Sequence, residues 1–278
     1  MQNHQFKLLR DVLSHTSYRN YSAGRLVMIS AMWMERIGYG WLAWELTHSE
    51  LWLGTLAACE MLIGIIVTPI AGAWADRINP LGLLKRCHIL SMVWSALLFA
   101  TIATDSINIY LLIALVMAKA SSSAFSQPVG MSMVNNLIGN NREHLGTAIS
   151  INATIFHLAR IIGPALGGLV ISFWGVAAVF AIGIFGFLTF VVTLHRGVTF
   201  EPTPVKANRG PILAEISAGL RYAMSHPALA PVLLLGITAS FLLRPYFDLL
   251  PSIADVMLNG GANGLAILAS ASGFGGLL

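Results

Sequence analysis

Seven ionisable side chains lie inside long apolar stretches of this 278-residue sequence, where charge is costly. A charge at the centre of a membrane helix costs about 2.5–3.5 kcal/mol on insertion scales, so such residues usually pair with one another or line a polar cavity. Their types allow two kinds of chemistry, proton binding at a carboxylate and recognition of a charged group. The seven residues are Glu35, Arg36, Glu60, Lys119, Arg160, Arg244 and Asp248.

The helical rise places several of these groups near one depth. Glu35 and Arg36 lie about 20 Å from the start of their expected helix. Arg160 lies about 24 Å along a second helix, and Lys119 about 18 Å along a third. We predict a polar cavity there that binds a small molecule and protons, with Glu35 as the proton carrier and Glu60 as the second candidate. The alternative is a set of structural ion pairs, such as Glu35 with Lys119 or Arg160.

Arg244 and Asp248 lie on either side of Pro245, four residues apart. Residues at this spacing are neighbours on one helix face. We expect them to pair at a kink, in a structural or a gating role.

The composition indicates an all-α integral membrane protein. The chain is 56% hydrophobic and 10% charged, whereas a soluble domain carries about 25% charged residues. The sequence has no glycine-rich phosphate loop with lysine, no metal-ligand spacing of His or Cys, and no nucleophilic serine motif. We therefore predict a protein that is not an enzyme and that needs no cofactor and no metal.

Apolar runs of about 20 residues can span a bilayer. They are expected at 22–46, 51–75, 82–104, 107–133, 144–172, 175–195 and 229–250, with an eighth beginning near 262. The domains expected from this pattern are an N-terminal segment (1–21), a six-helix bundle (22–196), a linker with an amphipathic helix (197–228) and the start of a second bundle (229–278). The last apolar run reaches residue 278 without a polar cap, so we expect a sequence that lacks its C-terminal part.

The net charge of +4 is distributed unevenly along the chain. Lysines and arginines lie in the N-terminal segment and then in alternate loops, and the loops near 47–51, 104–108, 173–176 and 251–262 contain none. Cytoplasmic loops of membrane proteins carry this excess. We expect a multi-pass protein of the cell (inner) membrane with a cytoplasmic N-terminus, surrounded by lipid, and no binding to nucleic acid.

A charged segment, GAWADRINPLGLLKR at residues 72–86, interrupts the apolar pattern between the second and third expected spans. It contains Gly72, Asp76, Arg77, Lys85 and Arg86. Such a cluster must face water or be held by partners.

A second segment, ARIIGPALGG at residues 159–168, lies within the fifth expected span. Ala159, Gly163, Gly167 and Gly168 give it a face of small residues, which allows close contact between membrane helices. Pro164 removes a backbone hydrogen bond and bends the helix.

These two segments resemble motifs of the major facilitator superfamily. The first resembles the superfamily's loop motif between helices 2 and 3, and the second resembles its antiporter motif on helix 5. Lys119 lies where the superfamily's helix-4 motif usually has arginine. The stretches YRNYSAGRLVMIS (18–30) and GLRYAMSHPAL (219–229) are similar to the drug and siderophore exporter branch, particularly to enterobactin exporters.

The resemblance implies two six-helix halves that rock around a central site. This chain would supply the first half and the first one to two helices of the second. Asp76 and Arg77 would then form a latch between the halves at the cytoplasmic end.

The function implied is export of hydrophobic or amphipathic small molecules, of the drug or siderophore type, by proton antiport in a monomer. A proton-coupled uptake symporter for a small organic anion is an alternative that the three expected cations Arg36, Lys119 and Arg160 suggest. An inactive truncated fragment is the other alternative.

Overall fold

The computed structural model describes residues 2–75, 77–138, 142–199 and 212–275, and no strand occurs among them. The all-α prediction is therefore confirmed for the described chain. The helices are α1 (Gln2–Ser14), α2 (Thr16–Thr47), α3 (Glu50–Ala75), α4 (Pro80–Ala103), α5 (Ile109–Ile138), α6 (Arg142–Trp174), α7 (Val176–Arg196), α8 (Ile212–Ser225), α9 (Leu229–Asp248), α10 (Leu250–Ser252), the π-helical turn η1 (Ile253–Met257) and α11 (Gly261–Gly275).

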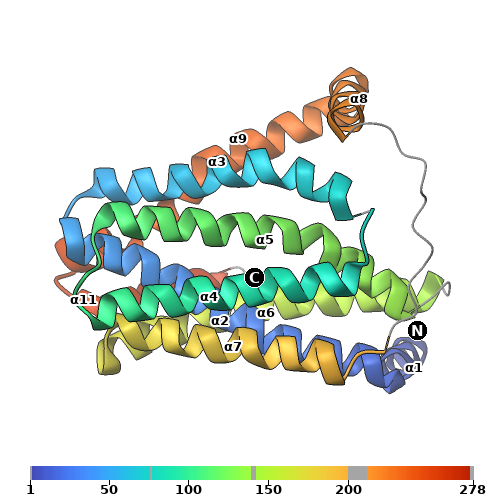
Figure 1. The fold of residues 1–278 in the computed structure, drawn as a ribbon, viewed down its shortest axis with the longest axis horizontal. Helices are drawn as coiled ribbons and strands as arrows, with labels where there is room; N and C mark the ends of the chain where they lie inside the picture. Colours follow the sequence, from blue (N-terminus) through green and yellow to red (C-terminus); the bar gives the residue numbers. More distant parts are fainter. Residues whose placement is uncertain (1, 76, 139–141, 200–211, 276–278) are drawn as a thin grey trace.

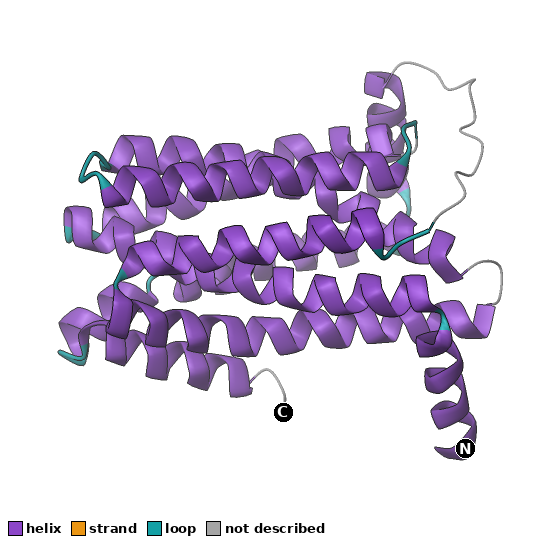
Figure 2. Cartoon of the chain, turned by 60° about the horizontal axis from the view of Figure 1, so that its bottom comes forward, coloured by secondary structure: helices purple, strands orange, loops and turns teal. Residues whose placement is uncertain are grey.

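The six helices α2 to α7 run back and forth and form the first bundle (Figure 1). The N-terminus, α1 and α8 lie at one end, which we call the N-terminal end. The turns after α2, α4 and α6 lie at the opposite end together with η1, and we call this the far end. Figure 2 shows that α1 projects from the N-terminal end. Residues 1–21 were expected only as a polar N-terminal segment, and α1 lies within it.

Five described helices are individually long and apolar enough to cross a membrane, namely α3 to α7. The bent pair of α8 and α9, whose axes turn by 101° between them, would add a sixth. The 32-residue α2 does not belong to this set although it is long enough. Half of its residues, 16 in number, are buried. Because α6 and α7 pack along it, α2 is shielded by protein and keeps polar and charged residues that a lipid-facing helix would not.

Glycines of the 159–168 segment bring α6 close to α2. A Cβ atom at Gly163 would lie 2.6 Å from the Cβ of Trp33 and 2.8 Å from the carbonyl oxygen of Ser30. At Gly167 it would lie 3.1 Å from the Cα of Met34. Any side chain here would push the two helices apart, so the backbone of α6 lies directly against α2.

The segment's next glycine contacts a different helix. A Cβ atom at Gly168 would lie 2.5 Å from the Cα of Ala266 in α11. Ala159, at the other end of the segment, is fully buried in the core of the first bundle, and Pro164 lies inside the continuous helix α6. This segment therefore packs α6 against the first bundle and also against the start of the second.

The substitution Gly163→Ala tests this packing. Because a methyl group would meet backbone atoms of α2, we expect a loss of stability of about 1–3 kcal/mol, as for other overpacked cores. Gly146→Ala is the matched control on the same helix, since nothing lies within 4 Å of its Cβ position. Thermal unfolding of the detergent-purified protein, followed by tryptophan fluorescence, should show a lower Tm for Gly163→Ala only. Equal Tm values for the two variants would contradict the close contact.

Candidate functional site

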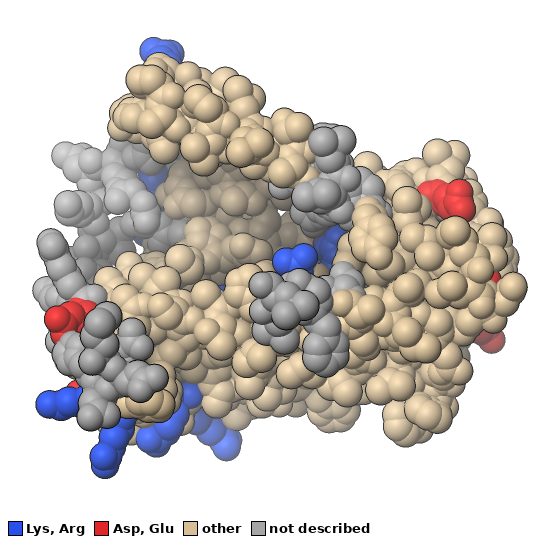
Figure 3. Space-filling view, turned by 180° about the vertical axis from the view of Figure 1, so that it is seen from behind, with Lys and Arg blue, Asp and Glu red and all other residues tan. Residues whose placement is uncertain are grey.

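A cleft of about 1140 Å³ lies between the first bundle and α9. Its walls come from α2, α3, α5 and α6 on one side and α9 on the other. Figure 3 shows the molecule hollowed beneath α8 and α9, with cationic side chains visible inside the hollow. The same view shows other lysines and arginines gathered at the N-terminal end. The cleft is large enough for an organic molecule of drug size.

Four of the charged residues singled out in the sequence line this cleft. They are Arg36, Glu60, Lys119 and Arg160. Aromatic side chains surround them, from Trp33, Tyr39, Phe156 and Phe247. The remaining wall is mostly aliphatic, and on α9 it includes Val232, Leu233 and Ile237. The cleft thus combines a large apolar surface with a few charged groups.

Glu35, the expected proton carrier, does not line the cleft. It is fully buried on the side of α2 that faces α7, where a Cβ at Gly183 would overlap its carboxylate. Its Oε2 accepts a hydrogen bond from Nζ of Lys119, which also donates to Oγ of Ser95. The Lys119 ammonium lies 4.7 Å from the ring centroid of Phe187. The pair therefore joins α2 to α4 and α5 against α7, as the structural alternative supposed.

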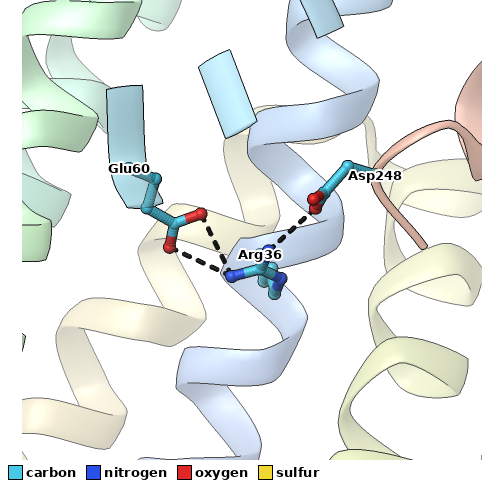
Figure 4. A network of polar contacts seen from close by, with 3 residues as sticks. All are labelled: Arg36, Glu60 and Asp248. Atoms are coloured by element: carbon cyan, nitrogen blue, oxygen red, sulfur yellow. Dashed lines mark hydrogen bonds and ion pairs between the residues drawn. The ribbon is translucent and has the colours of Figure 1, made fainter. Parts of the chain in front are cut away.

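Arg36 points the other way and binds two carboxylates (Figure 4). Its Nη1 donates to both oxygens of Glu60, at 3.0 and 3.1 Å. Its Nη2 donates to Oδ1 of Asp248 at 2.8 Å. These contacts connect α2, α3 and the last residue of α9, so they hold the second bundle to the first. We call them the Arg36 network.

Asp248, the second member of the pair expected within α9, binds Arg36 of α2. Whether it also pairs with Arg244 stays a prediction. The side chain of Arg244 lies outside the described residues. The end of α9 at Asp248, followed by α10, brings its carboxylate against α2, where the half-buried guanidinium of Arg36 needs a counter-charge.

Arg160 belongs to none of the described ion pairs. It is exposed within the cleft, and its guanidinium carbon lies 5.8 Å from the ring centroid of Trp33. The guanidinium carbon of Arg36 lies 6.0 Å from the centroid of the same ring. The two cations thus share one indole, which makes Trp33 a central element of the cleft.

The charged segment 72–86 lies at the N-terminal end, at the turn between α3 and α4. Gly72 lies on α3, and Lys85 and Arg86 lie on α4. The backbone N–H of Arg77 donates to the carbonyl oxygen of Trp74 at 2.9 Å. Asp76 lies outside the described residues, so the latch between Asp76 and the other half stays a prediction.

Further contacts at the far end were not anticipated from the sequence. Nε1 of Trp44 donates to Oδ2 of Asp255 at 2.9 Å. Oγ of Ser252 donates to Oε1 of Glu50 at 2.8 Å. Ser172 and Asn263 are hydrogen-bonded at 2.6 Å. Each links the first bundle to α10, η1 or α11. The only signal in the sequence was the polar character of these turns, which does not identify partners.

The architecture defines a class of protein. A solved structure, that of a bacterial homologue of the human lysosomal transporter Spinster in an inward-facing and unoccupied conformation, matches with a TM-score of 0.66 and 15% identity. The match covers 94% of this chain and 61% of that one. The fold is the major facilitator fold, as predicted. Residues 12–278 match the family model described as transmembrane secretion effector. The chain therefore belongs to this family of the major facilitator superfamily.

Three relatives are transporters. The staphyloferrin A transporter of Staphylococcus aureus is 25% identical over 251 residues, which cover 88% of this chain and 61% of the relative. The multidrug efflux pump Tap of Mycolicibacterium fortuitum is 27% identical over 227 residues, covering 75% and 52%. An uncharacterized MFS-type transporter of Bacillus subtilis is 25% identical, covering 73% and 48%. The chain thus spans about half to three-fifths of the length of these relatives.

A double-mutant cycle tests the buried pair. Lys119→Met or Glu35→Gln alone removes one partner and leaves the other unpaired, which costs about 3–5 kcal/mol for a buried ion pair. The double variant removes both charges, so we expect it to recover most of the lost stability. Thermal unfolding of the purified protein measures each variant. A double variant whose loss equals the sum of the single losses would show that the two residues act independently.

Asp248→Asn tests the Arg36 network. The neutral amide weakens the bond between α9 and α2, so we expect the far end to separate more often. Spin labels at Leu51 and Val256, both exposed near this end, report the separation by pulsed electron paramagnetic resonance, after Cys59 and Cys87 are replaced by alanine. The distance distribution should shift to longer values in Asp248→Asn and stay unchanged in the control Asp11→Asn on α1. An unchanged distribution in both would mean that other contacts hold this end.

Proposed function

We propose that this chain is part of a secondary transporter that exports amphipathic small molecules across the cell (inner) membrane in exchange for protons. The observation that supports this most directly is the cleft between the two bundles, with charged groups set in an apolar and aromatic wall. The relatives named as a siderophore transporter and a multidrug efflux pump also support it. Drug or siderophore molecules are the corresponding cargo class.

Alternating access would proceed by opening and closing the two ends of the cleft. The described polar contacts between the bundles join α2, α3 or α6 to α9, α10, η1 or α11 at or near the far end. The hollow seen in Figure 3 extends from there toward the N-terminal end. If the N-terminus is cytoplasmic, as the distribution of basic residues favours, this arrangement takes up cargo from the cytoplasm.

Glu60 is the carboxylate that we propose to carry the proton. It lines the cleft, where solute and solvent can reach it, whereas Glu35 is enclosed with Lys119. Protonation of Glu60 removes one of the two carboxylates that bind Arg36. Proton binding is thereby linked to the network that closes the far end, which is the requirement for coupling a proton to a conformational change.

A proton-coupled uptake symporter for a small organic anion is the second candidate. It is favoured by the cations that line the described part of the cleft, Arg36, Lys119 and Arg160. The direction in which the solute moves in a proton gradient distinguishes uptake by symport from export. An inactive fragment would move no solute in either direction.

Inverted membrane vesicles provide the test. With an acidic lumen, an exporter should accumulate its cargo inside, and a panel containing ethidium and a labelled siderophore samples the two compound types. Glu60→Gln should abolish accumulation against the gradient and retain exchange of labelled for unlabelled cargo, because exchange needs no net proton movement. Asp105→Asn, in the exposed turn after α4, is the control that should behave as wild type. Accumulation by Glu60→Gln at the wild-type level would exclude Glu60 as the carrier.

A further inference from the structure

Arg160 is the cation of the cleft that no described carboxylate neutralises. Of the other two cations, Arg36 binds Glu60 and Asp248, and Lys119 binds Glu35. Among the described residues that line the cleft, Glu60 is the acidic one, and it is held by Arg36. Arg160 has only the face of Trp33 as a favourable neighbour among the described contacts. A cation–π contact at an exposed site gives about 0.5–1 kcal/mol, which is less than an ion pair in a low-dielectric site provides.

Trp33 presents a second unsatisfied donor beside Arg160. The nitrogen of its indole N–H is buried and has no hydrogen-bond partner. The ring is fixed by edge-on contacts with Phe156 and Phe247, at 5.9 and 6.2 Å between ring centroids. Buried polar groups are nearly always hydrogen-bonded. Arg160 has a guanidinium without a carboxylate, and the adjacent Trp33 has an indole N–H without an acceptor. Each of the two favours the approach of an anion that accepts hydrogen bonds.

The side chains around Arg160 and Trp33 indicate the chemical character of the rest of the ligand. Phe156, Phe247 and the aliphatic side chains of α9 form an apolar wall next to the two donors. A guanidinium has a planar fork of donors that matches a carboxylate with two parallel hydrogen bonds, which an ammonium cannot do. We propose that Arg160, together with Trp33, anchors the carboxylate of an amphipathic anionic cargo whose apolar body lies against the aromatic wall. This inference rests on the proposed transport function, since it specifies the cargo class of the same cleft.

The proposal is tested by binding of three fluorescent probes that share one apolar body. These are 1-pyrenebutyrate, the neutral 1-pyrenebutanol and the cationic 4-(1-pyrenyl)butyl-trimethylammonium. Energy transfer from tryptophan to pyrene, together with probe anisotropy, measures their affinity for the purified protein in detergent. A hydrogen-bonded charge pair contributes about 1.5–3 kcal/mol, so wild type should bind the anion about tenfold or more tightly than the other two probes. Its affinity should fall as salt is added.

Variants assign the preference to one side chain. Arg160→Gln should erase the preference for the anion and leave binding of pyrenebutanol unchanged, whereas Arg160→Lys should retain part of it. Trp33→Phe, which keeps a ring and loses the N–H, should weaken the anion selectively. Arg10→Gln, an exposed arginine on α1, is the matched control and should bind all three probes as wild type does. If Arg160→Gln fails to fold, the affinities of the wild type and of Arg160→Lys for the three probes still test the proposal.

The outcomes separate this inference from the transport proposal. Equal affinities for the three probes, or a preference for the cation, would overturn the anionic cargo and leave export of amphipathic molecules standing. An anion preference that survives in Arg160→Gln would assign the charge selection to another residue and overturn the role of Arg160. Absence of binding by all three probes would overturn both proposals.

Discussion

The structure depends on the burial of charge at the middle of α2. Lys119 and Glu35 neutralise each other inside the first bundle, where Glu35 is fully enclosed and Lys119 reaches the wall of the cleft. Because each would be costly alone in that environment, α2, α4 and α5 must stay together for either to be tolerated. Because Glu35 neutralises the ammonium of Lys119, that charge is not available to a ligand. The charge left for recognition in the cleft is thereby concentrated on its arginines.

Arg36, the next residue along the chain, joins the two bundles. Successive residues on an α-helix are about 100° apart, so Arg36 leaves α2 toward the cleft while Glu35 faces the bundle interior. Arg36 then binds one carboxylate from each bundle, Glu60 and Asp248 (Figure 4). One turn of α2 therefore contains both the pair that holds the first bundle and the network that joins the bundles. Arg160 lies beside this network without belonging to it.

Much of the fold could be predicted from the sequence, and the reason is physical. Apolar runs between polar turns mark helices, and helices lie within a few residues of the expected spans. Charges such as Glu60 and Arg160 stand out because their surroundings are apolar. The partners of these charged residues could not be predicted from the sequence in the same way. Adjacent residues such as Glu35 and Arg36 face different regions. Asp248 binds Arg36 although the two are 212 residues apart in the sequence. Helix rotation and the meeting of two bundles decide these contacts, and neither is local.

The polar composition of α2 bears on how the chain enters the membrane. Insertion of a segment into lipid follows its own hydrophobicity, and α2 falls outside the set of helices apolar enough to span. The helices that bury it, α6 and α7, are synthesised after α3, α4 and α5. The ribosome therefore releases this helix before its two main packing partners exist. Until α6 and α7 follow, its position in the membrane would depend on the basic N-terminal segment and on the strongly apolar α3.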